Sequence, residues 1–361
     1  MGISAIVIVL TAFMISAVLT ARMRSWGPRL GLVDEPEGGR KDHGRVMPLG
    51  GGLAMVAAVF LTVFLGVLVE FVLRRFTSVH LLSQELYDLL WSRLPTAAAV
   101  LGGGLVIAAA GLVDDLRELG PWSKLAIEMA VALLLVLFGV RAGIFGGHVV
   151  LASVVTVLWI VGITNAFNLL DNMDGLSAGV AFIISLIFFI VAVQARQYFV
   201  AAFLLTVMGA TGGFLVFNFP PASIFMGDAG SLFIGYLLAV AAVIFSASCR
   251  PSYPLFSVTV PALVFAVPLF DTISVMIVRM LKGRSPFAAD KSHFSHRLVA
   301  IGMTARKAVF TNYLMTFCTG IAATLLYQTN TLGAITVFVQ VMAVIAIIVL
   351  LETAGQRLGR E

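Results

Sequence analysis

The chain has 361 residues, of which 60% are hydrophobic and only 11% are charged, and its mean hydropathy is +1.05. This balance excludes an ordinary soluble domain and predicts an all-α integral membrane protein. The formal net charge of +5 comes mostly from basic loops on one side of the membrane, so nucleic-acid binding is not indicated.

About eleven apolar runs follow one another along the chain, each long enough to cross roughly 30 Å of hydrocarbon as a helix. They lie near residues 3–21, 52–73, 96–113, 124–140, 149–167, 178–194, 198–217, 231–248, 254–278, 307–327 and 331–351. The polar stretches between them are too short for a soluble domain. Residues 1–361 are therefore expected to form a single polytopic membrane domain, with an active site in cytoplasmic loops.

The charges beside the first run predict the orientation of the chain. No basic residue precedes this run, and Arg22, Arg24 and Arg29 follow it, which is the reverse of a secretory signal. The run is therefore expected to be a retained helix with its N-terminus outside. When the following loops are assigned to alternate sides, most of the 23 Lys and Arg residues fall inside, as the positive-inside rule requires. The sequence predicts a multi-pass protein of the cell inner (plasma) membrane with a cytoplasmic C-terminus.

A basic loop precedes the second run, in the stretch GGRKDHGRVMPLGGG. Its basic side chains and histidine stand before the glycines at 50–52, and are Arg40, Lys41, His43 and Arg45. Side-chain cations and free backbone N–H groups at the start of a helix could together bind phosphate. Alternatively, the three glycines only allow close helix packing.

Five acidic residues follow apolar runs on the same predicted inner face: Asp114 and Asp115 in GLVDD, Asp171 and Asp174 in NAFNLLDNMDGL, and Asp228 in FMGDAGSL. A buried carboxylate is costly unless it is paired, hydrogen-bonded or bound to a metal, so five together indicate a shared cation. Any one of them could instead cap a helix or face water.

The spacing around Asp171 indicates the kind of metal. Asp171 and Asp174 are three residues apart, which on a helix places both side chains on one face. Asn165 and Asn168 continue this step toward the membrane. Carboxylate and amide oxygens suit Mg²⁺, or Mn²⁺, rather than zinc.

A second basic loop, VRMLKGRSPFAADKSHFSHRL, follows the ninth run and contains Arg279, Arg284, His293, His296 and Arg297. Clustered acids with a divalent cation beside phosphate-sized basic loops predict phosphoryl transfer between an anionic soluble substrate and a lipid. A basic loop that only orients the chain or contacts lipid headgroups is the simpler alternative.

Two further acids are expected to have structural roles. Asp271 lies within the ninth run and is expected to be a buried hydrogen-bond acceptor rather than a catalytic group. Glu128 lies one turn after Lys124 and is expected to pair with it.

The motifs appear in the order DEPEGGRKDHGRVMPLGGG, GLVDD, NAFNLLDNMDGL, FNFPPASIFMGDAGSLFIGY, PLFDT and LKGRSPFAADKSHFSHRL, which together span residues from about 30 to 300. In this order they resemble the polyprenyl-phosphate N-acetylhexosamine-1-phosphate transferases of glycosyltransferase family 4. The likeness is closer to the WecA and TagO branch than to the MraY branch, because R-K-x-H precedes P-L-x-G-G and an eleventh run follows.

The resemblance implies transfer of a sugar-1-phosphate, expected to be GlcNAc-1-phosphate, from a UDP-N-acetylhexosamine to undecaprenyl phosphate, with release of UMP. It also implies Mg²⁺ as cofactor, membrane lipid as surroundings, and a product that enters cell-envelope polysaccharide synthesis. The choice between a monomer and a homodimer is left open.

Residue by residue, the resemblance implies catalytic roles for Asp114, Asp115, Asp171, Asp174 and His296. It implies metal binding by Asp228 with Asp115. The implied substrate-binding residues are Arg40, Lys41, His43, Arg45, Asn168, Arg279, Arg284, His293 and Arg297. The family often has H-x-H-H in its histidine motif, and this chain has Ser295 at the third position, so the role of that middle histidine is unfilled.

Three alternatives remain. An MraY-like enzyme would transfer phospho-MurNAc-pentapeptide. An ion-coupled transporter also carries intramembrane acids, although it would place them at mid-membrane rather than near one face. A CDP-alcohol phosphatidyltransferase would need D-G-x-x-A-R, and the stretch after Asp174 and Gly175 reads LSAGV.

Overall fold

The computed structural model describes residues 2–34, 46–78, 81–143, 148–248, 254–285, 292–326, 329 and 331–358. Its helices are α1 (Gly2–Trp26), α2 (Gly51–Phe76), α3 (Gln84–Ser92), α4 (Leu94–Leu116), α5 (Pro121–Leu137), α6 (Val149–Leu170), α7 (Leu176–Gln194), α8 (Tyr198–Asn218), α9 (Asp228–Ala247), α10 (Pro254–Val264), α11 (Ala266–Leu281), α12 (Phe294–Ala300), α13 (Ala305–Leu326) and α14 (Thr331–Leu358). A short 3-10 helix (Pro28–Leu30) precedes β1 (Val33–Asp34), which pairs antiparallel with β2 (Met47–Pro48).

Length and apolar character identify the helices that can cross a membrane. In the described part of the chain, nine helices meet this requirement: α1, α2, α4, α6, α7, α8, α9, α13 and α14. The predicted all-α membrane protein is thus confirmed. The count of eleven crossings is not, because the run near 124–140 forms α5, a helix of 17 residues that is not among these nine.

The run near 254–278 forms two helices instead of one. The axes of α10 and α11 differ by 73° at the break between Val264 and Ala266, and the pair adds a tenth crossing only if it counts as one bent span. Pro268 has no N–H group to donate to the carbonyl of Val264, so the helical hydrogen-bond ladder is interrupted where the bend occurs.

α9 is the central helix of the bundle. Of its apolar window, 94% is buried, and it packs against α2, α4, α6, α7, α8 and α10. Glycines let two of these backbones come close: a Cβ on Gly52 would lie 2.3 Å from Gly230, and a Cβ on Gly111 would lie 2.5 Å from Ala229. The first residues of α9 are therefore pressed against α2 and α4.

The glycines that begin α2 serve this packing. The N–H groups of Gly51 and Gly52 donate to the carbonyls of Phe225 (3.1 Å) and Met226 (2.9 Å). Free backbone donors for phosphate, one of the two interpretations of this motif, are therefore not present at these two residues. The alternative of close packing is confirmed.

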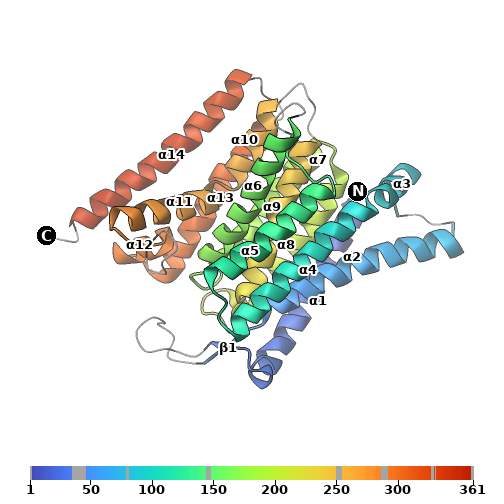
Figure 1. Ribbon diagram of the computed structural model, residues 1–361, viewed down its shortest axis with the longest axis horizontal. Coiled ribbons are helices and arrows are strands. Elements are labelled where there is room, and N and C mark those ends of the chain that lie inside the picture. Colours follow the sequence, from blue (N-terminus) through green and yellow to red (C-terminus); the bar gives the residue numbers. More distant parts are fainter. Residues whose placement is uncertain are drawn as a thin grey trace.

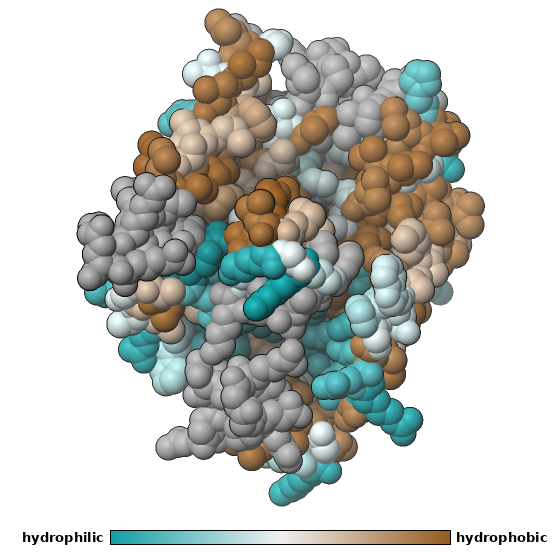
Figure 2. Space-filling model, turned by 60° about the vertical axis from the view of Figure 1, so that its left-hand side comes forward, coloured by the Kyte–Doolittle hydropathy of each residue, from teal (hydrophilic) through white to brown (hydrophobic). Residues whose placement is uncertain are grey.

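Polar groups collect at one end of the bundle. In Figure 1 the long helices lie side by side, β1 is at the lower end, and α14 lies at the edge, away from α9. Figure 2 shows hydrophilic side chains gathered in the lower half of one face, below a mostly hydrophobic upper half. The predicted acidic residues lie at helix ends: Asp114 and Asp115 in the last turn of α4, Asp171 just after α6, Asp174 just before α7 and Asp228 at the start of α9.

Candidate active site

Lys124 joins two of the predicted acidic residues. Its Nζ lies 2.9 Å from Asp114 Oδ2 and 2.9 Å from Asp228 Oδ2. Because these residues belong to the last turn of α4, the first turn of α5 and the start of α9, one ammonium group connects three helices. The three side chains are partly exposed, so a soluble ligand can reach them.

Asp115 caps the start of α9. Its Oδ1 accepts a hydrogen bond from the N–H of Asp228 (2.7 Å), and its Oδ2 accepts one from the N–H of Ala229 (3.1 Å). Gly227 has a φ of +71°, and a Cβ there would lie 2.6 Å from the Asp115 carboxylate. The position of Asp228 therefore depends on Asp115, through the N-terminus of α9.

Residues Asp171–Gly175, here called the acidic loop, connect α6 to α7. Asp171 is the C-cap of α6, and Gly175, with a φ of +74°, is the N-cap of α7. Asp174 Oδ2 accepts from the N–H of Ala222 (2.9 Å) in the loop before α9. The predicted shared helix face of Asp171 and Asp174 is wrong, because the chain turns here and both residues lie outside the helices.

Two more helices hold the acidic loop. The N–H of Gly175 donates to Asn218 Oδ1 at the end of α8 (2.9 Å). The Tyr313 hydroxyl in α13 donates to the Gly175 carbonyl (2.5 Å). The acidic loop is thus held in place by hydrogen bonds to α8 and α13.

The acidic residues act on one another electrostatically. Burial is the main cause that raises the pKa of the Asp171 carboxyl to about 8, and the negative charges of Asp228, Asp115 and Asp174 act in the same direction. A cation among these carboxylates would oppose both effects. This end of the bundle is therefore electrostatically suited to a positive ligand.

Asn165 and Asn168 lie on one face of α6, as their spacing predicts. Asn168 Nδ2 donates to Ser231 Oγ in α9 (3.0 Å), and Asn165 donates to Glu128 Oε2 in α5. The predicted pair of Glu128 with Lys124 is wrong, because Lys124 instead lies between two carboxylates.

Residues Ser292–Arg297, here called the histidine segment, pack against α11. His293 Nδ1 lies 2.8 Å from Asp271 Oδ2, and the N–H of Phe294 donates to Asp271 Oδ1 (2.6 Å). The buried Asp271 is thus the structural acceptor that the sequence predicts. Arg297 donates to the Ser292 carbonyl (2.8 Å) and to Ser274 Oγ (3.1 Å), so it also anchors the segment.

The other predicted substrate-binding residues differ in their surroundings. Arg279 is buried within α11, whereas Arg284 is exposed beyond its end. His296 is partly exposed, and its ring centre lies 6.4 Å from that of His293. The basic residues of the first loop, Arg40, Lys41, His43 and Arg45, lie outside the described residues.

Known proteins resemble this chain over most of its length. A Bacillus subtilis (strain 168) protein named as a probable undecaprenyl-phosphate N-acetylglucosaminyl 1-phosphate transferase is 34% identical over 330 residues, which cover 88% of this chain and 85% of the relative. The model of the family described as glycosyl transferase family 4 matches residues 97–246. The chain belongs to glycosyl transferase family 4.

Two other known proteins are also similar to this chain. A decaprenyl-phosphate N-acetylglucosaminephosphotransferase of Mycolicibacterium smegmatis is 32% identical over 370 residues, covering 95% of this chain and 86% of the relative. An undecaprenyl-phosphate alpha-N-acetylglucosaminyl 1-phosphate transferase of Escherichia coli (strain K12) is 25% identical over 312 residues, covering 83% of this chain and 77% of the relative.

The segment that matches the family 4 model contains every acidic residue discussed above except Asp271, together with Lys124. The histidine segment lies beyond this match, yet the structure brings it to the acidic loop: Ser295 Oγ donates to Asn172 Oδ1 (2.7 Å). The two motifs therefore form neighbouring walls of one site.

The site also contains residues that are not among the predicted ones, including Lys124, Asn172, Asn218 and Tyr313. Lys124 carries a usable signal, because a lysine in the first turn of an apolar helix on the acidic side needs a counter-charge. Asn172 and Tyr313 carry none, since their partners are distant in sequence or belong to the backbone.

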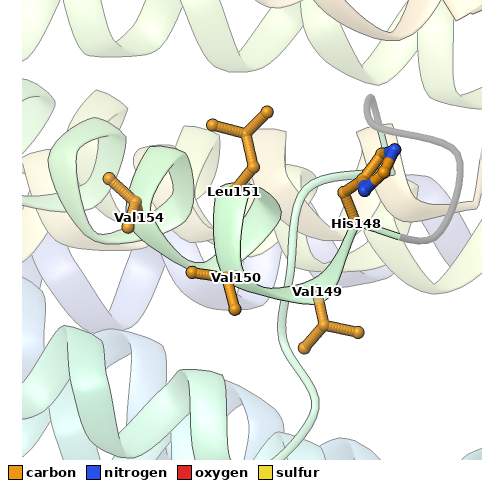
Figure 3. Close-up of a pocket in the computed structure, with 5 residues that line it drawn as sticks. All are labelled: His148, Val149, Val150, Leu151 and Val154. Carbon is orange, nitrogen blue, oxygen red and sulfur yellow. The ribbon is translucent and has the colours of Figure 1, made fainter.

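An apolar surface hollow lies elsewhere, at the first turn of α6, lined by His148, Val149, Val150, Leu151 and Val154. Figure 3 shows these side chains spread around the start of that helix. The acidic loop follows the opposite end of the same helix, so this hollow is separate from the candidate active site.

Proposed function

We propose that this protein transfers GlcNAc-1-phosphate from UDP-GlcNAc to undecaprenyl phosphate and releases UMP. The observation that carries the proposal is the cluster of carboxylates around Lys124 at the polar end of a membrane bundle. The names of the Bacillus subtilis and Escherichia coli relatives support this acceptor and this sugar phosphate. In the reaction, an oxygen of the lipid phosphate bonds to the β-phosphorus, and the bond from that phosphorus to the bridging oxygen breaks.

Charge repulsion is the main obstacle to this reaction. Two like charges about 4 Å apart repel by roughly 4 kcal/mol at an effective dielectric constant of 20, and here a phosphate must approach a diphosphate. Lys124 provides one fixed positive charge beside the acids. It also holds Asp114 and Asp228 in place.

The carboxylates fit Mg²⁺, with Mn²⁺ as the alternative, when it binds together with a diphosphate. Among the described residues, no three His, Cys, Asp or Glu side chains are grouped to hold a metal by themselves. Mg²⁺ usually takes one or two carboxylates plus substrate phosphates and water, and Asp228 and Asp171 can provide two. Asp115, also predicted to bind the metal, has lone pairs left beyond its two N–H contacts. A bound Mg²⁺ would neutralise charge on the diphosphate.

Asp114 and Asp115 act by positioning rather than by removing a proton. A phosphate monoester has a second pKa of about 6 and is mostly dianionic at neutral pH. Removal of a proton from the lipid phosphate by a base would therefore increase the reaction rate only slightly. Both carboxylates are already engaged: Asp114 with Lys124 and the N–H of Leu119, and Asp115 with α9.

The histidine segment and the acidic loop form the donor side of the site. Asn168 and Asp174 organise the nucleotide and the metal, while His293, His296 and the basic residues bind the donor phosphates and sugar. The protein lies in the inner membrane with its N-terminus outside and its C-terminus in the cytoplasm, where the UDP-sugar is available. Its product enters cell-envelope polysaccharide synthesis.

The test incubates purified protein with undecaprenyl phosphate, Mg²⁺ and one UDP-sugar at a time, and measures UMP. We expect UMP from UDP-GlcNAc, dependent on both lipid and divalent cation. UMP only from UDP-MurNAc-pentapeptide would assign the MraY-like activity instead. The absence of UMP with every sugar would overturn the enzyme assignment.

A further inference from the structure

A hydrogen bond connects the two walls of the site at Ser295, where the histidine motif departs from the common pattern. Ser295 Oγ donates to Asn172 Oδ1 at 2.7 Å. The other end of the same amide, Asn172 Nδ2, donates to the Leu169 carbonyl at the end of α6 (2.8 Å). The Asn172 side chain is therefore oriented by both contacts.

Each wall has its own anchors apart from this bond. The histidine segment is held on α11 by Asp271 and by Arg297. The acidic loop is held by Asn218 and Tyr313. Met173 of the loop also packs against the apolar cluster that contains Phe294 and Leu298, but an apolar contact does not define orientation as a hydrogen bond does.

We infer that Ser295 is a positioning residue, whose hydrogen bond to Asn172 sets the placement of the acidic loop relative to the histidine segment. The inference rests on the proposed function for its effect on turnover. Asn172 lies directly after Asp171 and two residues before Asp174, so a shift of the backbone at Asn172 moves both carboxylates. Misplacement of reacting groups by about 1 Å can cost roughly 100-fold in rate.

The surroundings make the bond important. Ser295 is only 2% exposed, so its hydroxyl has little access to water, and its loss removes one of the two hydrogen bonds that orient the Asn172 amide. Ser295 is the second residue of α12, and alanine is a better helix former than serine. Ser295→Ala therefore removes the bond without weakening the helix.

The experiment compares Ser295→Ala, Asn172→Ala and the double variant with the wild type, after thermal unfolding has measured the folded fraction. Ser153→Ala is the matched control, because Ser153 Oγ donates to the Val149 carbonyl at the far end of α6 (2.7 Å). One readout is UMP release at varied UDP-GlcNAc concentration. The other is hydrogen exchange of the acidic-loop amides, which needs no activity and therefore separates this inference from the proposed function.

We expect Ser295→Ala to lower kcat by about tenfold with KM for UDP-GlcNAc changed less than about twofold, and to speed exchange in the acidic loop. In the Asn172→Ala background the same change should add nothing further. Unaltered exchange in Ser295→Ala, or losses in kcat that multiply in the double variant, would overturn the inference.

Discussion

The Lys124 ammonium group lies between the carboxylates of Asp114 and Asp228, which belong to different helices, and reduces the repulsion between them. Lys124→Met keeps most of the length of the side chain but removes its charge, so Asp114 and Asp228 would face each other without this counter-ion. We expect UMP release to fall by about 100-fold or more, because a fixed charge that favours the transition state is lost.

A matched control distinguishes this effect from lost stability. Arg74 binds the buried Glu70 at 2.6 Å near the end of α2, far from the acidic loop in the fold. Arg74→Met should lower the melting temperature without reducing activity per folded molecule. Equal activity losses in both variants would show that Lys124 serves only folding.

Asp115 allows a test of positioning against proton removal. Asparagine keeps one of the two oxygen acceptors that hold the N–H groups of Asp228 and Ala229, and alanine keeps neither, so Asp115→Asn should retain several-fold more activity than Asp115→Ala. Rate profiles between about pH 6 and 9 should show no rescue of either variant, since the lipid phosphate is already ionised. Full recovery of Asp115→Asn at high pH would instead identify a base.

The sequence predicts which residues have a structural or functional role better than it predicts which residues they contact. Asp271 could be recognised as a structural acceptor because a carboxylate inside an apolar run must find donors. The partners of Lys124 could not be recognised in this way. Glu128, one turn away on the same helix, fits the spacing expected of an ion pair, whereas the acids that bind Lys124 belong to α4 and α9. Sequence spacing describes only neighbours on the same helix.

At the scale of elements, α13 supports the acidic loop through Tyr313. A Cβ on Gly179, in the first turn of α7, would lie 2.1 Å from the Tyr313 ring. Gly179→Ala should push this ring away from the Gly175 carbonyl and reduce UMP release by about tenfold or more. Tyr313→Phe, which loses only the hydroxyl, should have a smaller effect.

Gly162→Ala is the control for this substitution, because a Cβ on Gly162 in α6 meets no atom within 4 Å. It should leave activity unchanged and stabilise the protein slightly, as alanine favours a helix over glycine. If Gly179→Ala behaves like Gly162→Ala in UMP release, the packing of Tyr313 does not matter for the site.

The length of the apolar runs predicts where helices form but not where they bend or end. Helices were correctly expected in every run, because each run is long and hydrophobic. The bend between α10 and α11 was missed, since hydropathy does not register the missing donor of Pro268. The three-residue steps from Asn165 and Asn168 to Asp171 and Asp174 predict one shared helix face, but α6 ends at Leu170, before both acids.

At the scale of the whole molecule, the acidic cluster makes stability depend on pH. The folded pKa of Asp171 is about 8, above its ordinary value of 3.8, so the folded protein holds a proton that the unfolded chain has lost between these values. The free energy of unfolding contributed by Asp171 therefore falls as pH rises through this window.

Mg²⁺ should oppose this loss, because a cation favours the ionised carboxylate. We expect the melting temperature in EDTA to fall between about pH 6 and 8, and Mg²⁺ to raise it most at the higher pH. In Asp171→Asn both trends should weaken. An unchanged pH slope in that variant would show that other groups cause the dependence.

Because α9 is buried among other helices, the thickness of the surrounding bilayer acts on it only indirectly. Helices at the rim, such as α1 and α14, face outward along most of their length, so they adapt to shorter or longer acyl chains by tilting or by a local change in bilayer thickness. α9 is enclosed by protein over 94% of its apolar window, so lipid thickness acts on it only through its neighbours. We expect the depth of Asp228 to be set by helix packing rather than directly by the length of the surrounding acyl chains.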